Sequence, residues 1–224
     1  MSLIVATNLS KDYQTGEVVI RALKGLSFRI EPASFVSFVG PSGSGKTTLL
    51  NLIGCLDKPT EGRLEVAGVD VSGLDRSQGA SFRGSKIGFI FQDFNLIPVL
   101  TVYENIEYPL IMVQDVPGPE RSKRVLALLE AVGMIEQMHK FPDQISGGQK
   151  QRVAVARALV TSPELVLADE PTANLDHETA QSIIDLMKEL NEKEGVTFLF
   201  STHDQRLINE VKRVVRIDDG RIIQ

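Results

Sequence analysis

The sequence predicts an α/β fold with a parallel sheet at its core, an antiparallel β subdomain at the N-terminal side and an inserted helical subdomain. Three patterns support this prediction. Short β-like runs separated by turn residues fill the first part of the chain, a helical pattern follows, and helices then alternate with apolar strands. We expect one domain over residues 1–224, with the helical subdomain at about residues 93–162, because no repeat, low-complexity tract or long linker divides the chain.

The N-terminal part contains β-like runs at residues 3–9, 18–23, 26–30 and 35–39. Gly16, Gly25 and Pro32 lie between these runs and mark turns. Antiparallel strands are the natural interpretation of this spacing. Two further runs, residues 63–66 and 87–91, suggest more strands of the same sheet.

The pattern becomes helical from residue 120 to residue 132. Val125, Leu128, Leu129 and Val132 recur at intervals of three and four, with basic residues on the other face. A helix at residues 146–160, a strand at 165–168, a helix at 177–191 and a strand at 196–201 follow. This alternation predicts the parallel core.

The composition indicates the expected cellular compartment and argues against some classes of partner. The 224 residues are 42% hydrophobic and 24% charged, and no apolar run approaches the roughly 18 residues of a membrane-spanning helix. The N-terminus shows no secretory signal, so we expect a cytoplasmic protein. Cys55 is the only cysteine, which excludes an internal disulfide, and we expect a small buried hydrophobe there. The net charge of -5 argues against nucleic acid as a partner.

A phosphate-binding loop is the clearest motif. It lies between the apolar run 35–39 and a helix that begins near Thr48, and it has the P-loop spacing. Glycines let backbone amides turn towards an anion, and the helix N-terminus adds a partial positive charge. Lys46 would reach the outer phosphates of a nucleotide, and the hydroxyl of Thr47 would ligate Mg²⁺. The alternative is a glycine-rich turn that happens to contain a lysine. The loop comprises Gly40, Pro41, Ser42, Gly43, Ser44, Gly45, Lys46 and Thr47.

Acidic residues and a histidine end two later strands. Asp169 and Glu170 follow the run 165–168, where parallel sheets place their ligands. Asp169 would hold Mg²⁺, directly or through a neighbour, and Glu170 would act as the base for a water aimed at the γ-phosphate. Considered without the loop, the two acids would be solvated side chains. His203 follows the strand at 196–201 and could hydrogen-bond the γ-phosphate, although a loop histidine is more often structural.

A second anion-binding helix end is predicted at residues 146–149. Ser146 and Gln149 form the pattern of a capping box, which alone would explain them. A cap does not require Gly147 and Gly148, and both glycines would let an anion approach the exposed amides.

The segment 145–152 resembles the signature motif of ATP-binding-cassette (ABC) proteins. With the phosphate loop before it and the acidic pair after it, the whole chain is similar to an ABC nucleotide-binding domain, a P-loop NTPase. The resemblance implies ATP and Mg²⁺ as ligands and ATP hydrolysis as the activity. It also implies a head-to-tail homodimer in the ATP-bound state, in which Ser146 and Gly148 act on the partner's nucleotide. Ile145 departs from the more common leucine, an apolar exchange that should preserve function.

Further matches follow from the resemblance. Gln92 matches the glutamine that senses Mg²⁺ and the attacking water, and would otherwise be a solvated residue after a strand. Tyr13 matches the aromatic that stacks on adenine, and would otherwise belong to the core or the surface. Asp176 matches the interface aspartate of the D-loop, and it also has the position of a helix N-cap. His203 matches the switch histidine.

Residues 52–62 and 91–98 are similar to ATPases of the lipoprotein-releasing and macrolide-exporting group (LolD and MacB). This implies a separate integral membrane permease, export or extraction of a lipoprotein, drug or peptide, and a peripheral location on the inner face of the inner membrane. Residues 94–101 would receive the permease's coupling helix, or would serve only in packing. A mechanical complex that signals to cell-wall enzymes is an alternative. A DNA-maintenance ABC protein is a weaker one, because no coiled coil occurs between residues 93 and 145.

Overall fold

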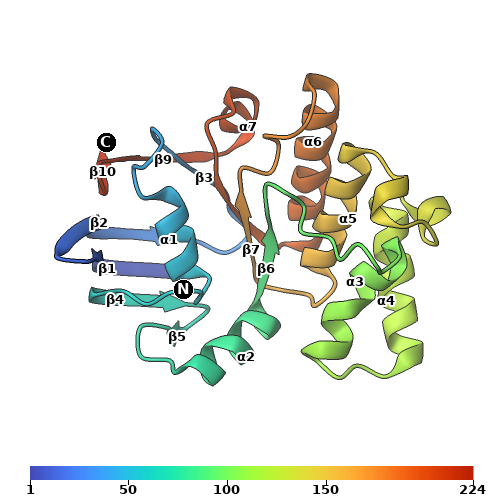
Figure 1. Cartoon of the computed structure of the whole chain (residues 1–224), viewed down its shortest axis with the longest axis horizontal. Coiled ribbons are helices and arrows are strands. Elements are labelled where there is room, and N and C mark those ends of the chain that lie inside the picture. Colours follow the sequence, from blue (N-terminus) through green and yellow to red (C-terminus); the bar gives the residue numbers. More distant parts are fainter. Residues whose placement is uncertain (224) are drawn as a thin grey trace.

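The computed structural model describes residues 1–223 and contains two β-sheets with helices beside them (Figure 1). The first sheet is antiparallel and has the strand order β2-β1-β4-β5. Its strands are β1 (Ile4–Thr15), β2 (Val18–Ile30), β4 (Glu61–Val66) and β5 (Val69–Asp70). This confirms the N-terminal antiparallel part of the predicted fold.

The second sheet has the strand order β10-β9-β3-β8-β7-β6, and all neighbours except β10 and β9 are parallel. Its strands are β3 (Phe35–Val39), β6 (Ile87–Ile90), β7 (Leu165–Asp169), β8 (Thr197–Ser201), β9 (Arg213–Asp218) and β10 (Arg221–Ile223). Every residue of β3 and β8 is buried, as expected for parallel strands covered on both faces.

Two strand assignments from the sequence are wrong. The runs 35–39 and 87–91 were expected in the antiparallel sheet, but β3 pairs parallel with β8 and β9, and β6 pairs parallel with β7. The runs 18–23 and 26–30 form one strand, β2, which is irregular at Gly25. Gly25 has φ +69°, and its N–H donates to the Ser10 hydroxyl at 3.1 Å, so the strand continues through a bend where the sequence predicts a turn.

The predicted helices are present with shifted ends. They are α1 (Lys46–Ile53), α4 (Gly118–Ala131), α5 (Gly147–Leu159) and α6 (His177–Glu194). The structure adds α2 (Arg76–Lys86), α3 (Val102–Met112) and α7 (Gln205–Glu210), as well as 3-10 turns at Ile135–Gln137 and Pro142–Gln144. None of the described helices is both long and apolar enough to cross a membrane.

The parallel sheet separates two hydrophobic clusters. The antiparallel sheet and α1 lie on one side of it, and α3, α4, α5 and α6 lie on the other (Figure 1). Alternate residues of β8 point to opposite clusters: Phe198 and Phe200 to the helical side, Leu199 to the α1 side. This packing fixes the strands, so the carboxyl ends of β3, β7 and β8 meet at one edge.

Candidate functional site

A cavity of about 590 Å³ lies at the edge where β3, β7 and β8 end. It brings together the loop after β3, the acidic pair after β7 and the histidine after β8, as well as Gln92. Ala22 of β2 and Ser201 of β8 also line it, and the sequence had not indicated either residue. The predicted residues that line the cavity are Gly40, Pro41, Ser42, Gly43, Gly45, Lys46, Thr47, Thr48, Gln92, Asp169, Glu170 and His203.

The loop between β3 and α1 depends on its glycines. Gly45 has φ +104°, and a Cβ there would lie 2.7 Å from the Ala22 carbonyl oxygen. A Cβ on Gly40 would lie 2.0 Å from the Ile217 carbonyl oxygen, so only glycine allows β9 to pass this closely. The loop is therefore held tightly against the two neighbouring strands.

Lys46 is the first residue of α1, and its side chain lies inside the loop. Its Nζ donates to the carbonyl oxygens of Gly40 and Pro41, at 2.9 Å each, and only 9% of the residue is exposed. The ammonium group is thus positioned by the loop itself, next to amides at the N-terminus of α1. A buried cation in such a cradle suits an anionic ligand.

Thr47 and Asp169 meet across the cavity. The Thr47 hydroxyl lies 3.1 Å from Asp169 Oδ2, which joins the start of α1 to the end of β7. A hydroxyl and a carboxylate are hard oxygen donors of the kind that Mg²⁺ takes together with substrate phosphates. The described residues contain no group of three or more His, Cys, Asp or Glu side chains that would form an all-protein metal cage. The donor set therefore fits Mg²⁺ bound with a phosphate.

Glu170 is held from three sides. Its φ is +48°, and its N–H donates to the Ser201 carbonyl at 2.8 Å. One carboxylate oxygen lies 2.8 Å from His203 Nδ1, and the other accepts from the Thr202 hydroxyl at 3.2 Å. His203 itself remains 77% exposed. Thr202 is fully buried, and the only sequence signal for it is its place beside His203.

Tyr13 of β1 does not line the cavity. Its hydroxyl donates to Asp57 at 2.9 Å, and Lys11 Nζ lies 4.9 Å from its ring centroid. Partial burial raises the pKa of Tyr13, and Asp57 also disfavours its ionised form. The residue is 36% exposed, which leaves area for a stacking ligand.

The N-terminus of α5 also lies outside the cavity. Ser146 Oγ accepts from the N–H of Gln149 at 3.3 Å, and Gln149 Oε1 accepts from the N–H of Ser146 at 3.0 Å, which forms the predicted capping box. A Cβ on Gly148 would lie 2.3 Å from Thr179 Cγ2, whereas one on Gly147 would meet nothing closer than 3.7 Å. Close packing on α6 therefore explains Gly148 but not Gly147.

The segment before α6 links the site to the Gln92 region. Asp176 is the N-cap of α6, because it accepts from the N–H of Thr179 at 3.0 Å. Hydrogen bonds from the Thr179 side chain and from its N–H lower the pKa of Asp176. Asn174 Nδ2 donates to the Gln92 carbonyl and to Asp93 Oδ1, at 3.0 Å each. This tertiary contact of Asn174 has no signal in the sequence.

Comparisons with known proteins agree with this geometry. The family model described as ABC transporter matches residues 23–173. An uncharacterised ABC transporter ATP-binding protein of Thermotoga maritima is 48% identical, with 95% of this chain and 90% of that protein covered. The lipoprotein-releasing system ATP-binding protein LolD of Anaeromyxobacter dehalogenans is 46% identical over 97% of this chain and 91% of LolD.

Solved structures show the same fold. The ATP-binding cassette MJ0796, a protein of Methanocaldococcus jannaschii, superposes with a TM-score of 0.90 at 44% identity, with 99% of this chain and 97% of that chain covered; its structure is described as a dimeric post-hydrolysis state bound to ADP and phosphate. This chain therefore belongs to the ABC transporter family, as an ATP-binding subunit with ATPase activity.

Proposed function

We propose that this subunit binds two ATP molecules in a head-to-tail homodimer and drives a separate membrane permease in export or extraction. The observation that carries the proposal is the position of the α5 N-terminus. Residues 146–149 present helix-end amides but contribute nothing to the cavity of their own chain. A second copy, turned head to tail, would bring this end to the first copy's nucleotide. The dimeric description of the MJ0796 cassette supports this arrangement.

Within one chain, the loop at residues 40–48 would hold the phosphates of the nucleotide. Lys46 would exchange the loop carbonyls for outer phosphate oxygens, because both are acceptors for the same ammonium group. Thr47, Gln92 and Asp169, which line the same cavity, would hold Mg²⁺. Bound there, Mg²⁺ would neutralise charge on the phosphates.

Glu170 is proposed as the base that orients and deprotonates the attacking water. Thr202 and His203 fix its carboxylate at the end of β7, which limits the rotamers it can adopt. His203 is exposed and bound to Glu170, so it can turn towards a γ-phosphate while Thr202 continues to hold the other carboxylate oxygen. Hydrolysis would then depend on positioning and electrostatics.

The permease is proposed to dock in an apolar groove between α2, β6, α3 and α5. This groove has a volume of about 490 Å³, and Phe91 and Asn95 line it on either side of the Gln92 segment. Since Gln92 itself lines the nucleotide cavity, one short segment connects the two sites. We propose that a short helix of the permease binds in this groove. The segment 94–101 is fixed at its other side by buried Asn105, which bonds Ile97 and Leu100.

Export or extraction is proposed from the similarity to LolD and to MacB of Syntrophobacter fumaroxidans. This MacB is 46% identical to the chain, which covers 31% of the longer MacB protein. The permease would specify the lipoprotein, drug or peptide. We propose action at the inner face of the inner membrane. Co-purification of the membrane partner from detergent extracts identifies the permease, and a partner without transport activity would favour mechanical signalling.

The variant Glu170→Gln tests the composite site. It should keep ATP affinity, lose nearly all turnover and elute as a dimer in size-exclusion chromatography with Mg²⁺ and ATP, because bound ATP is no longer hydrolysed. Glu192→Gln, an exposed position on α6, is the matched control and should behave as wild type. Elution of Glu170→Gln as a monomer at saturating ATP would contradict the proposal.

A further inference from the structure

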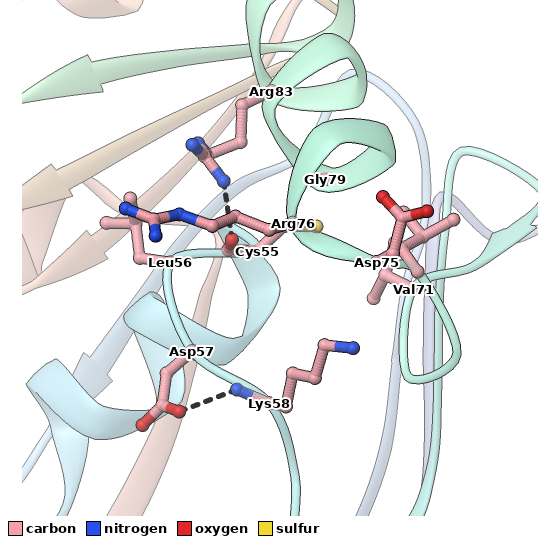
Figure 2. Close-up of a pocket in the computed structure, with 10 residues that line it drawn as sticks. Cys55, Leu56, Asp57, Lys58, Val71, Asp75, Arg76, Gly79 and Arg83 are labelled. Carbon is pink, nitrogen blue, oxygen red and sulfur yellow. Dashed lines mark hydrogen bonds between the residues drawn. The ribbon is translucent and has the colours of Figure 1, made fainter.

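A second cavity of about 640 Å³ lies at the other end of α1, between the segment that follows this helix and α2 (Figure 2). It shares no lining residue with the nucleotide cavity. The eight residues of α1 separate the two, and at 1.5 Å per residue they span about 12 Å. A ligand here would therefore be distinct from the nucleotide.

Three cations from two elements line this second cavity. Arg76 and Arg83 are seven residues apart on α2 and thus share one face of the helix, and Lys58 comes from the segment after α1. Arg83 donates to the Cys55 carbonyl at 2.7 Å. In residues 1–223, no carboxylate lies within ion-pair distance of Lys58, Arg76 or Arg83. The cations therefore keep their charge available.

Two acids, Asp57 and Asp75, also line this cavity, and both already accept hydrogen bonds. Asp57 accepts from Lys11 at 2.6 Å, from the Tyr13 hydroxyl at 2.9 Å and from the N–H of Lys58 at 2.7 Å. Asp75 caps α2 by accepting from the N–H of Gln78 at 2.8 Å. Three cations and two carboxylates line the cavity, so its local charge is positive in a chain of net charge -5.

The remaining wall of the cavity is apolar. Leu56, Val71 and Leu74 line it, and Leu56 is 50% exposed. Gly79 lies on the same face of α2 as the two arginines, and its missing side chain leaves room beside Cys55. The cavity thus combines a cationic end with an apolar surface and is larger than an inorganic phosphate requires.

We propose that this cavity binds a phosphate-bearing organic anion, with the phosphate beside Arg76 and Arg83 and the organic part against Leu56 and Leu74. The Lys58 side chain extends to the other side of the cavity, towards Val71 and Asp75, and adds a positive charge there (Figure 2). Guanidinium groups form paired, charge-assisted hydrogen bonds with phosphate oxygens, which makes this class the best match to two arginines. A soluble phosphate ester and an anionic phospholipid headgroup share this chemistry.

Calorimetry with the full chain tests the proposal. The nucleotide site is first saturated with ADP, and pyrophosphate is the soluble probe. Wild type should bind it at one site. The double variant Lys58→Gln/Arg76→Gln should bind at least about tenfold more weakly, because one guanidinium contact and a second positive charge in the cavity are lost. Lys123→Gln/Lys140→Gln removes the same charge from exposed positions on the helical side and should bind as wild type. Arg76→Lys keeps the charge but loses the paired hydrogen bonds of a guanidinium, so its affinity should lie between those of wild type and the double variant.

Vesicle flotation separates the two sources of phosphate. Phosphatidylcholine vesicles with and without phosphatidylglycerol are mixed with the same proteins. Retention that depends on phosphatidylglycerol and on Lys58 and Arg76 supports a headgroup ligand, and calorimetric binding alone supports a soluble ester. The proposal is overturned if wild type binds neither probe, or if the Lys58/Arg76 variant binds both as wild type does. Neither readout depends on ATP hydrolysis, so the result is independent of the proposed function.

Discussion

Replacing Gly148 by alanine tests why a glycine stands at the second position of α5. The added Cβ would lie 2.3 Å from Thr179 Cγ2 of α6. Carbon atoms in contact are normally about 3.5–4.0 Å apart, so the overlap exceeds about 1 Å. The methyl group points towards α6 of the same chain. Its effect should therefore be a displacement of the α5 N-terminus from α6.

The expected change in the free energy of unfolding combines two opposing contributions. Overpacking of this kind costs about 1–3 kcal/mol, and the better helix propensity of alanine returns up to about 1 kcal/mol. We expect Gly148→Ala to lower the free energy of unfolding by about 1–2 kcal/mol. Gly147→Ala is the matched comparison, because its Cβ would meet nothing closer than 3.7 Å, and its stability should not fall.

A second substitution makes the test decisive. Thr179→Ser removes the clashing methyl group but keeps the hydroxyl, so Gly148→Ala/Thr179→Ser should recover both the stability and the ATPase rate of Thr179→Ser alone. Urea denaturation and steady-state phosphate release measure the two quantities. If the double variant recovers stability while its ATPase rate stays low, contact with α6 is not the reason that activity needs Gly148, and the reasoning is refuted.

Three other changes test single contacts. Lys46→Ala should weaken ADP binding in calorimetry by about tenfold or more, since a charge-assisted contact to phosphate is lost; unchanged affinity would remove Lys46 from the phosphate site. Ser146→Arg should abolish cooperative ATPase activity while ADP affinity stays at the wild-type value, and full hydrolysis would argue against a composite site. Asp204→Asn should cost about 2 kcal/mol at neutral pH, because Arg206 and Thr172 hold the pKa of Asp204 at about 2, below the usual 3.8. This stabilisation is present above pH 3.8 and is lost as pH falls through about 2, so urea denaturation should show the two proteins converging in acid.

Local sequence patterns predict the second half of the fold well. The helices α5 and α6 and the strands β7 and β8 have clear periodicity and capping residues, and their expected ends differ from the observed ones by a few residues at most. Sheet membership of β6 was wrong because four apolar residues do not indicate their partner, which here is β7, 75 residues or more away in the chain. The helix α2 escaped prediction since Phe82 is its only large apolar residue.

The sequence predicts the candidate site in part, as it does the fold. The strand-end argument predicts which loops meet, and the structure places Lys46, Asp169, Glu170 and His203 around one cavity. The contacts that orient these groups were not predictable. Thr202 reaches Glu170 from 32 residues away, and Asn174 reaches Gln92 from 82 residues away, and neither residue type marks such a role in sequence. Contacts of this kind depend on how the strands are ordered in the sheet.

The N-terminus of α5 shows that a structural and a functional interpretation of one motif can both hold. The capping box uses the Ser146 hydroxyl to satisfy the amide of Gln149, the third residue of the helix. The amides of Gly147 and Gly148 precede it and have no intrahelical acceptor, because the first amides of any helix lack one. The cap thus fixes the direction of the helix end while two amides stay available to an anion. The cap and the proposed phosphate site can therefore share one turn, and Gly147, which has no packing partner that requires glycine, is the residue at which we propose that a partner's nucleotide approaches.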